Sequence, residues 1–598
     1  MCGIVGVLNL GENQFSPSDL HFVNSAKVTL NHRGPDDFNS MNFSDKLLLG
    51  FNRLTIVDNS PNAMQPFETE KSLMVFNGEI YNFESLRDNL DQYNLNFKSY
   101  SDTEVLQQYI DHKGLGALND LNGMFSIAYF NKETETLQLI RDRFGVKPLY
   151  YHVKKDKVFF ASEVKALLPI IDNLEINSYS LGKYINETMT DFDTNTLYNN
   201  ILQIGQGSYL SVDKKISSQV KWYSPKIVRS KQYSSNRYFY DNQFEDLLVN
   251  AIKLRISGEF PTCMTISGGV DSTTLYTLIK ERIGVPIELF YLDHPGKITS
   301  ELETVRTIVK KYGDKLTIIN SNKQIPSLID ISEAIKLTDF PSWGLSTSDY
   351  SNIYQSIHKG GFRIVLEGHG SDELFGGYPY FLKSVAFSSL RKFKLISYFR
   401  FSLDYFQATG NKIRAYKFLL FVLEGLKNLY VKRIQIDLDT VIINTITRSI
   451  LPIVLRTFDR VQMHASVEGR APFLDFRIFE YVSDLSIDFS IGEYGLKSHL
   501  KRILKKYNNE FVFENQPKRG FSADLPGIFE SKKFRNELKQ LLSIPNLDKY
   551  IQQDLLDKTR NFLFSDSVNE FEIFEFSKVI QAIIFIQIKD DLRRIIYK

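Results

Sequence analysis

Cysteine, tryptophan, long apolar runs and an excess of charge of either sign are all scarce in this chain of 598 residues. Its two cysteines, Cys2 and Cys263, cannot build a disulfide framework or a cysteine metal cluster, which favours a reducing compartment. A formal net charge of +2 predicts no nucleic-acid partner. The longest apolar runs, such as 579–588, are far shorter than the roughly 20 residues that cross a bilayer. With no signal-peptide pattern either, we expect a cytoplasmic protein.

The length predicts at least two domains, because single hydrophobic cores stop growing beyond about 250–300 residues. Short strand patterns between polar turns predict an α+β domain of layered sheets over residues 2–210. A polar stretch without periodicity predicts a linker over 211–237. Strands then alternate with helices, so residues 238–598 should form a doubly wound parallel sheet with a helical C-terminal part. An aromatic and basic helical insertion is expected at about 383–435.

Cys2 is the first candidate catalytic residue. Removal of Met1 would place its thiol beside its own α-amine, whose pKa lies near about 7.7–8.0. That amine could serve as the base for the thiol, and a thiolate is a strong nucleophile. Taken alone, however, a cysteine at the second position is usually incidental.

Further polar residues of the first domain suit an amino-acid substrate with an amide side chain. Asn77 and Gly78 offer an amide group and a backbone N–H for a developing oxyanion. Arg53 can hold a carboxylate in a bidentate manner, and Asp102 can face an ammonium group. Each also has a plain structural interpretation, because Asn-Gly is most often a turn and single charges most often lie on the surface.

Together and in this order, these segments resemble the glutaminase domain of the N-terminal-nucleophile amidotransferases, over roughly residues 2–210. The resemblance implies the N-terminal nucleophile hydrolase fold. It also implies that Cys2 attacks the glutamine side-chain amide, forms a γ-glutamyl thioester and releases ammonia, with Asn77 and Gly78 as the oxyanion hole. The glutamine-binding positions that it implies are Arg53, Asn77, Gly78, Glu79 and Asp102.

A second motif lies between a predicted strand and a predicted helix: Ser267-Gly268-Gly269-Val270-Asp271-Ser272. Two glycines let the backbone approach a phosphate closely, and the N-terminus of the following helix favours anions. Asp271 is suited to a magnesium ion that bridges the phosphate. A later loop, 367–378, offers Asp372 as a second magnesium ligand. The string differs from the Walker pattern of P-loop proteins.

These segments resemble the synthetase domain of glutamine-hydrolysing asparagine synthetases, whose pyrophosphate loop is that of the ATP pyrophosphatases. The resemblance implies that ATP adenylylates a carboxylate, that ammonia displaces AMP, and that Mg²⁺ is the cofactor. Its implied metal ligands are Asp271 and Asp372. A water-poor passage would have to carry ammonia between the two sites. The implied ATP and pyrophosphate contacts are Thr265, Ser267, Gly268, Gly269, Asp271, Ser272, Tyr291, Glu367, Gly368 and Lys518.

One loop departs from the family's pattern. Asparagine synthetases usually carry Ser-Gly-Glu-Gly where this chain has Glu367-Gly368-His369-Gly370. The family's glutamate is tied to the acyl-adenylate intermediate, and His369, with an ordinary pKa of about 6.5, stands in its place. Two interpretations stay open. The exchange is compensated within the loop and the acceptor is aspartate, which we favour, or the acceptor is another carboxylate, such as a sugar acid of a cell-surface polysaccharide or a peptide.

The sequence leaves the other partners open. The basic aromatic segment at 383–435 can lie on an anionic membrane, although such segments are more often helical insertions with solvated lysines. A homodimer is neither predicted nor excluded. A non-catalytic scaffold that binds glutamine or nucleotide is a third hypothesis, and the intact Cys2, Asn77-Gly78 and 267–272 oppose it.

Overall fold

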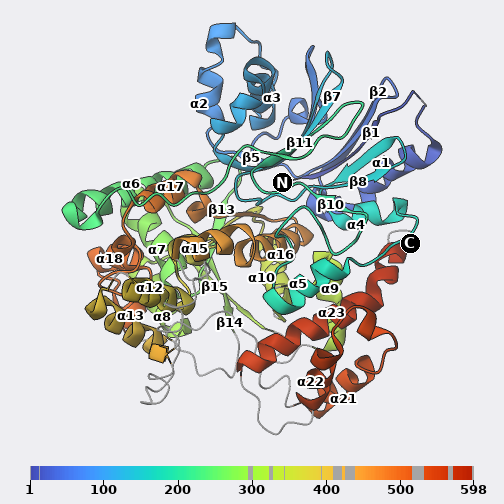
Figure 1. Cartoon of the computed structure of the whole chain (residues 1–598). Helices are drawn as coiled ribbons and strands as arrows, with labels where there is room; N and C mark the ends of the chain where they lie inside the picture. Colours follow the sequence, from blue (N-terminus) through green and yellow to red (C-terminus); the bar gives the residue numbers. More distant parts are fainter. Residues whose placement is uncertain are drawn as a thin grey trace.

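The computed structural model describes residues 2–12, 14–293, 301–321, 327–342, 344–345, 347–391, 393–408, 421–423, 438–514, 531–562 and 570–595. Two antiparallel sheets form the N-terminal region, and one parallel sheet with helices on both faces forms the rest (Figure 1). The predicted fold class, an α+β layered domain followed by a doubly wound α/β domain with a helical C-terminal part, is confirmed.

The first antiparallel sheet has the strand order β10-β8-β9-β1-β3-β2. The central strand β1 is buried along its whole length, which fits its run of Ile, Val and Leu. Because Cys2 directly precedes β1, its side chain is buried in the core of this domain. The strands are β1 (Gly3–Asn9), β2 (Asp37–Phe43), β3 (Leu47–Arg53), β8 (Tyr150–Lys154), β9 (Lys157–Ala161) and β10 (Leu202–Gln203).

The second antiparallel sheet has the order β12-β11-β7-β6-β5-β4. Its inner face meets the first sheet in a core that joins Leu49 and Phe51 with Val75 and Phe130. Strand β12 lies inside the stretch that we predicted as a linker and pairs with β11. The strands are β4 (Phe67–Glu68), β5 (Ser72–Ile80), β6 (Gly123–Asn131), β7 (Thr136–Arg141), β11 (Ser208–Val212) and β12 (Val220–Lys221).

Helices cover the outer faces of both antiparallel sheets. Helix α1 (Pro17–Thr29) packs on the first sheet, while α2 (Phe83–Asp88) and α3 (Asp102–Lys113) cover the second. Two further helices, α4 (Val164–Leu167) and α5 (Ser178–Glu187), lead toward the second region. The result is a stack of helix, sheet, sheet and helix layers.

The parallel sheet has the order β15-β14-β13-β16-β17, so the chain reverses direction across the sheet between β13 and β16. Side chains alternate between its faces: Met264 packs toward α7 and α8, and Cys263 packs toward α10 and α16. The elements are α6 (Arg237–Ile256), β13 (Thr262–Thr265), α7 (Val270–Leu278), β14 (Glu288–Asp293), α8 (Glu301–Tyr312), β15 (Leu316–Asn320), α9 (Leu328–Thr338), α10 (Thr347–Lys359), β16 (Ile364–Leu366), α11 (Ser371–Phe375) and β17 (Glu468–Arg470).

Helices make up most of the remaining chain, and the last of them, α23, returns to pack on α5 and α9. The predicted insertion at about 383–435 includes α12, α13 and residues 421–423, while 409–420 and 424–437 lie outside the described residues. The helices are α12 (Pro379–Arg391), α13 (Leu395–Ala408), α15 (Leu438–Thr447), α16 (Ile450–His464), α17 (Phe476–Asp484), α18 (Ser498–Lys506), α19 (Phe511–Glu514), α21 (Lys532–Leu541), α22 (Gln553–Phe562) and α23 (Glu570–Ile595).

The helical stretch Leu438–His464 is long and apolar enough to cross a membrane by length and composition. It consists of α15 and α16, and its side chains Leu451, Ile453 and Val461 are fully buried. Within the described residues it therefore forms part of the globular core.

Candidate active sites and the pocket between them

Cys2 lies where the ends of β1, β3 and β5 meet. Its backbone N–H donates to Oδ1 of Asn77 over 3.1 Å. Arg53, the last residue of β3, donates through Nη2 to two carbonyls of the following loop at 2.7 and 2.9 Å. Burial raises the pKa of the Cys2 thiol above its ordinary value, so attack at neutral pH needs a base beside it.

The other predicted glutamine-binding residues surround the same point. Gly78 has φ +151°, and a Cβ there would lie 2.0 Å from the carbonyl oxygen of Met124, so only glycine fits. Asp102 begins α3 and accepts the N–H of Ile80 over 3.0 Å. Burial raises the pKa of Asp102 to about 6. The amide nitrogen of Asn77, which an oxyanion hole would use, faces away from Cys2 and donates to another side chain within the sheet.

Two residues of the second region complete the wall behind Cys2. Arg470 of β17 is fully buried, and its Nε lies 2.8 Å from Oε2 of Glu79 and 2.7 Å from Oε1 of Glu468. Glu79 and Glu468 thus share one cation from the second region, and burial, together with Glu468, raises the pKa of Glu79 well above its ordinary value. Nothing in the sequence of the segment 467–475 indicates a partner in the first domain.

The predicted pyrophosphate loop connects β13 to α7, at the point where the strand order reverses. In open α/β sheets ligands bind in the crevice at such a point. The backbone N–H of Ser267 donates to Oγ of Ser272 over 3.1 Å, which closes the loop. A Cβ on Gly368 would lie only 3.2 Å from Cβ of Asp271, so the loops after β13 and β16 touch.

Lys497 is a site residue that sequence reasoning missed. Its ammonium group lies 2.6 Å from Oδ1 of Asp372 and also pairs with Oδ2 of Asp271. Burial alone would lower the pKa of Lys497, but the two carboxylates hold it above its ordinary value. In the sequence, Lys497 is only a lysine directly before a basic stretch, 498–506, and looks like any solvated lysine.

His369 and Glu367 form a pair at the carboxyl end of β16. Nδ1 of His369 lies 2.9 Å from Oε2 of Glu367, and the ring packs on Phe458 with centroids 3.9 Å apart. Glu367 also accepts hydrogen bonds from Tyr354 and Gln462. The carboxylate of Glu367 thus holds His369 in place. A direct contact of Glu367 with ATP would have to use its backbone.

The remaining predicted contacts are Thr265, Tyr291 and Lys518. Thr265 ends β13 and pairs with Phe290. Tyr291 is buried in the core on the side of the sheet that α7 and α8 cover. Lys518 lies outside the described residues.

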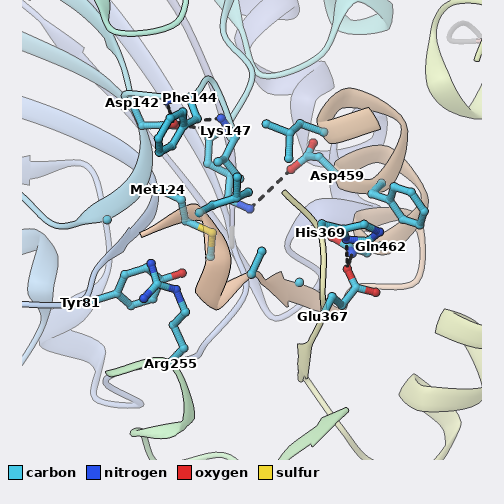
Figure 2. Close-up of a pocket in the computed structure, with 17 residues that line it drawn as sticks. Tyr81, Met124, Asp142, Phe144, Lys147, Arg255, Glu367, His369, Asp459 and Gln462 are labelled. Atoms are coloured by element: carbon cyan, nitrogen blue, oxygen red, sulfur yellow. Dashed lines mark hydrogen bonds and ion pairs between the residues drawn. The ribbon is translucent and has the colours of Figure 1, made fainter. Parts of the chain in front are cut away.

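A small pocket with a cavity volume of about 40 Å³ lies between the two regions (Figure 2). Gly469, between the two β17 residues at the Cys2 site, and His369 both line it. Its wall contains both apolar and charged side chains. The lining residues are Tyr81, Gly123, Met124, Asp142, Phe144, Val146, Lys147, Arg255, Glu367, His369, Leu455, Phe458, Asp459, Gln462, Gly469, Ala471 and Leu474.

A buried ion-pair cluster joins the two regions beside this pocket. Arg33 donates to the carbonyl of Cys2 over 3.2 Å and to Asp459 of α16 over 2.9 Å. The same arginine donates to Glu163 over 2.7 Å. Because α16 also carries Phe458 and Gln462, one helix contacts both candidate sites.

Comparison with known proteins agrees with this two-site architecture. Residues 1–223 match the family model of a glutamine amidotransferase domain, and residues 243–565 match that of asparagine synthase. A glutamine amidotransferase domain followed by an asparagine synthase domain defines the class of amidotransferases with a synthetase domain. The chain belongs to the asparagine synthase family.

Relatives of the chain include three glutamine-hydrolyzing asparagine synthetases of Bacillus subtilis (strain 168). The chain is 28% identical to the first over 66% of its own length, 27% to the second over 81%, and 25% to the third over 84%. These matches span 61%, 66% and 84% of the three relatives, so for the first two the chain covers less than two thirds of their length.

Proposed function

We propose that the chain hydrolyses glutamine at Cys2 and uses the ammonia to amidate an ATP-activated carboxylate, with AMP and pyrophosphate as products. The acceptor that we favour is the side chain of aspartate. The observation that supports the proposal is a pocket lined both by Gly469, whose neighbours Glu468 and Arg470 meet Glu79, and by His369 of the loop after β16.

In the glutaminase half, the Cys2 thiol attacks the amide carbon of glutamine and forms a thioester. Its own nitrogen, once it is an α-amine, takes the thiol proton and passes it to the leaving ammonia. Arg53 binds the substrate carboxylate and Asp102 its ammonium group. Gly78 N–H and a rotated Asn77 amide stabilise the oxyanion, because preorganised donors act most strongly where charge develops.

In the synthetase half, the loop 267–272 binds the phosphates of ATP and Lys497 neutralises the departing pyrophosphate. Lys518, in the undescribed stretch, is a second candidate for that task. Asp271 and Asp372 suit Mg²⁺, because both carboxylates already converge on one cation, Lys497, and magnesium in proteins takes one or two carboxylates plus phosphates. Mg²⁺ bound there would supply charge neutralisation of the β- and γ-phosphates.

His369 takes the proton that the attacking ammonia must lose. Its Nδ1 is fixed by Glu367, which leaves Nε2 as the nitrogen for proton transfer. This role preserves the family reaction with imidazole in place of carboxylate. The same exchange favours a second candidate function, amidation of another carboxylate such as a sugar acid. A neutral or cationic imidazole at this position interacts with the acceptor differently from the negatively charged glutamate of the family.

One assay separates the two candidate functions. The protein is supplied with glutamine, Mg-ATP and one acceptor at a time, and glutamate, AMP and pyrophosphate are followed. Aspartate-dependent pyrophosphate release with equal asparagine supports the first function. Glutamate release without aspartate-dependent pyrophosphate rejects aspartate as the acceptor, and formation of ADP instead of AMP rejects the reaction class.

A further inference from the structure

A buried carboxylate of the second region lies beside Cys2 of the first. Glu468 begins β17 and is 1% exposed, and its Oε1 lies 2.7 Å from Nε of Arg470. The same Nε lies 2.8 Å from Oε2 of Glu79. Alternate residues of a strand point to one face, so Glu79 lies on the same side of β5 as Asn77, which accepts the N–H of Cys2. Glu468 therefore approaches the nucleophile across the boundary between the two regions.

The two carboxyl groups at Arg470 carry one negative charge between them. All three side chains are buried, and one guanidinium cannot balance two buried carboxylates. Burial raises the pKa of Glu79 well above its ordinary value, and its hydrogen bond with Glu468 raises it further. Burial alone would raise the pKa of Glu468 as well, but Arg470 and Lys147 hold it below its ordinary range. At neutral pH Glu79 is thus the neutral member of the pair and Glu468 the charged one.

The charge of Glu468 acts on Cys2. Burial raises the pKa of the Cys2 thiol, and the carboxylate of Glu468 adds to that rise because like charges disfavour the thiolate. Further charged and titratable groups surround the two residues from both regions. They are Arg33, Arg53, Glu79, Tyr81, Asp102, Lys147 and Arg470.

We propose that Glu468 is a positioning residue of the Cys2 site, which the second region thereby completes. When the α-amine of Cys2 takes the proton from the thiol sulfur, it becomes an ammonium ion, and the sulfur electron pair attacks the amide carbon. The carboxylate of Glu468 stabilises that ammonium ion, as a buried aspartate stabilises the imidazolium of a serine protease triad. This role rests on the proposed function, because the amine is the base only if Cys2 attacks glutamine.

The test compares two isosteric changes at the same arginine, Glu468→Gln and Glu79→Gln, in the full chain. The first removes the charge beside Cys2, and the second replaces a carboxyl group that is already neutral. A carboxylate raises the pKa of a nearby amine, so Glu468→Gln should move the acidic limb of kcat/KM for glutamine about one unit to lower pH. It should also lower kcat about tenfold, the equivalent of one pKa unit. Glu79→Gln should leave the limb in place, whatever its effect on KM.

Alkylation of Cys2 by iodoacetamide gives a readout that needs no turnover. Mass spectrometry of the Cys2 peptide measures the rate against pH, and alkylation of the fully buried Cys263 reports unfolding. Glu468→Gln should shift the alkylation midpoint to lower pH, because the thiolate loses a repulsive neighbour. Glu468→Asp keeps the charge but retracts it, so its shift should be in the same direction and smaller.

The outcomes separate this role from a merely structural one. No shift in Glu468→Gln, or an equal shift in Glu79→Gln, overturns the proposal. If Cys263 becomes alkylated in Glu468→Gln, that variant has unfolded and Glu468→Asp decides: its smaller shift supports the proposal, and its absence overturns it. A shift in alkylation without any glutamine hydrolysis would keep Glu468 beside the thiol and reject only the proposed function.

Discussion

The two candidate sites are built in opposite ways. The Cys2 site lies at strand ends inside stacked sheets, and its residues are fixed by backbone contacts such as that of Gly78 with Met124. The synthetase site lies on loops at the carboxyl edge of a parallel sheet, where Lys497 arrives from the turn before α18 and Gln462 from α16. The difference predicts that a change at Cys2 abolishes glutamine hydrolysis and leaves the other half-reaction unchanged. Changes at the loops should instead lower the rate of the synthetase half-reaction by different amounts.

Replacement of Cys2 by alanine should have the largest effect. Without the thiol no thioester can form, so glutamine-dependent turnover should fall at least about a thousandfold. Pyrophosphate release driven by added ammonium should stay within about twofold, because the other site is untouched. Glutamate and pyrophosphate assays measure both rates. Glutamine-driven turnover that persists in this variant would contradict Cys2 as the nucleophile.

The next largest effect is expected for Lys497→Ala. Removal of a buried cation at the phosphate site should lower ammonium-driven pyrophosphate release about a hundredfold or more, while glutamine hydrolysis continues. Lys505→Ala, in the helix α18 that directly follows Lys497 but exposed, is the control and should change neither rate. If both lysine variants behave alike, the ion pairs of Lys497 are only structural.

A third variant tests the contact between the two regions. Asp459→Asn leaves Arg33 and Lys147 buried without a full counter-charge, so the free energy of unfolding should fall by about 3 kcal/mol or more. Asp172→Asn breaks an exposed pair with Lys154 and should cost at most about 1 kcal/mol. Urea denaturation of both variants measures the difference. Equal losses would show that the buried cluster does not hold the regions together.

The smallest effect is a shift of pH dependence. Burial lowers the pKa of His369, but Glu367, with further contributions from Glu373 and Asp271, raises it above its ordinary value. A base must be neutral to accept a proton, so ammonium-driven amidation should increase as pH rises through that raised pKa. Glu367→Gln lowers the pKa of His369 and should move this acidic limb to lower pH by about one unit.

His369→Gln provides the matching comparison for that profile. It removes the titrating ring, so the acidic limb assigned to His369 should disappear and the rate should fall. An acidic limb that stays at the same pH in both variants would assign it to another group.

Local pattern was enough to predict most of the fold and the surroundings of Cys2. Strands such as Leu47–Arg53 and Ser72–Ile80 follow from short apolar runs between polar turns. Gly78 lies in β5 next to Asn77, which contacts Cys2, and Asp102 at the start of α3 contacts Ile80 of the same strand.

The rest depends on packing between distant segments, which no local pattern contains. Lys497 lies 226 residues from Asp271, and Arg470 reaches Glu79 from the other domain. Strand β12 was missed because two exposed residues, Val220–Lys221, give no periodic signal. Tyr291 was assigned to ATP by resemblance, yet its side chain belongs to the core because strand alternation points it there.

Competition between nitrogen sources tests the central claim, that the interdomain pocket carries ammonia from one site to the other. The protein receives glutamine labelled with ¹⁵N in its amide, a large excess of unlabelled ammonium, Mg-ATP and the acceptor that supports pyrophosphate release. We predict that mass spectrometry finds the amide product carrying mostly ¹⁵N. A product labelled only in proportion to the mixed pool would contradict direct transfer.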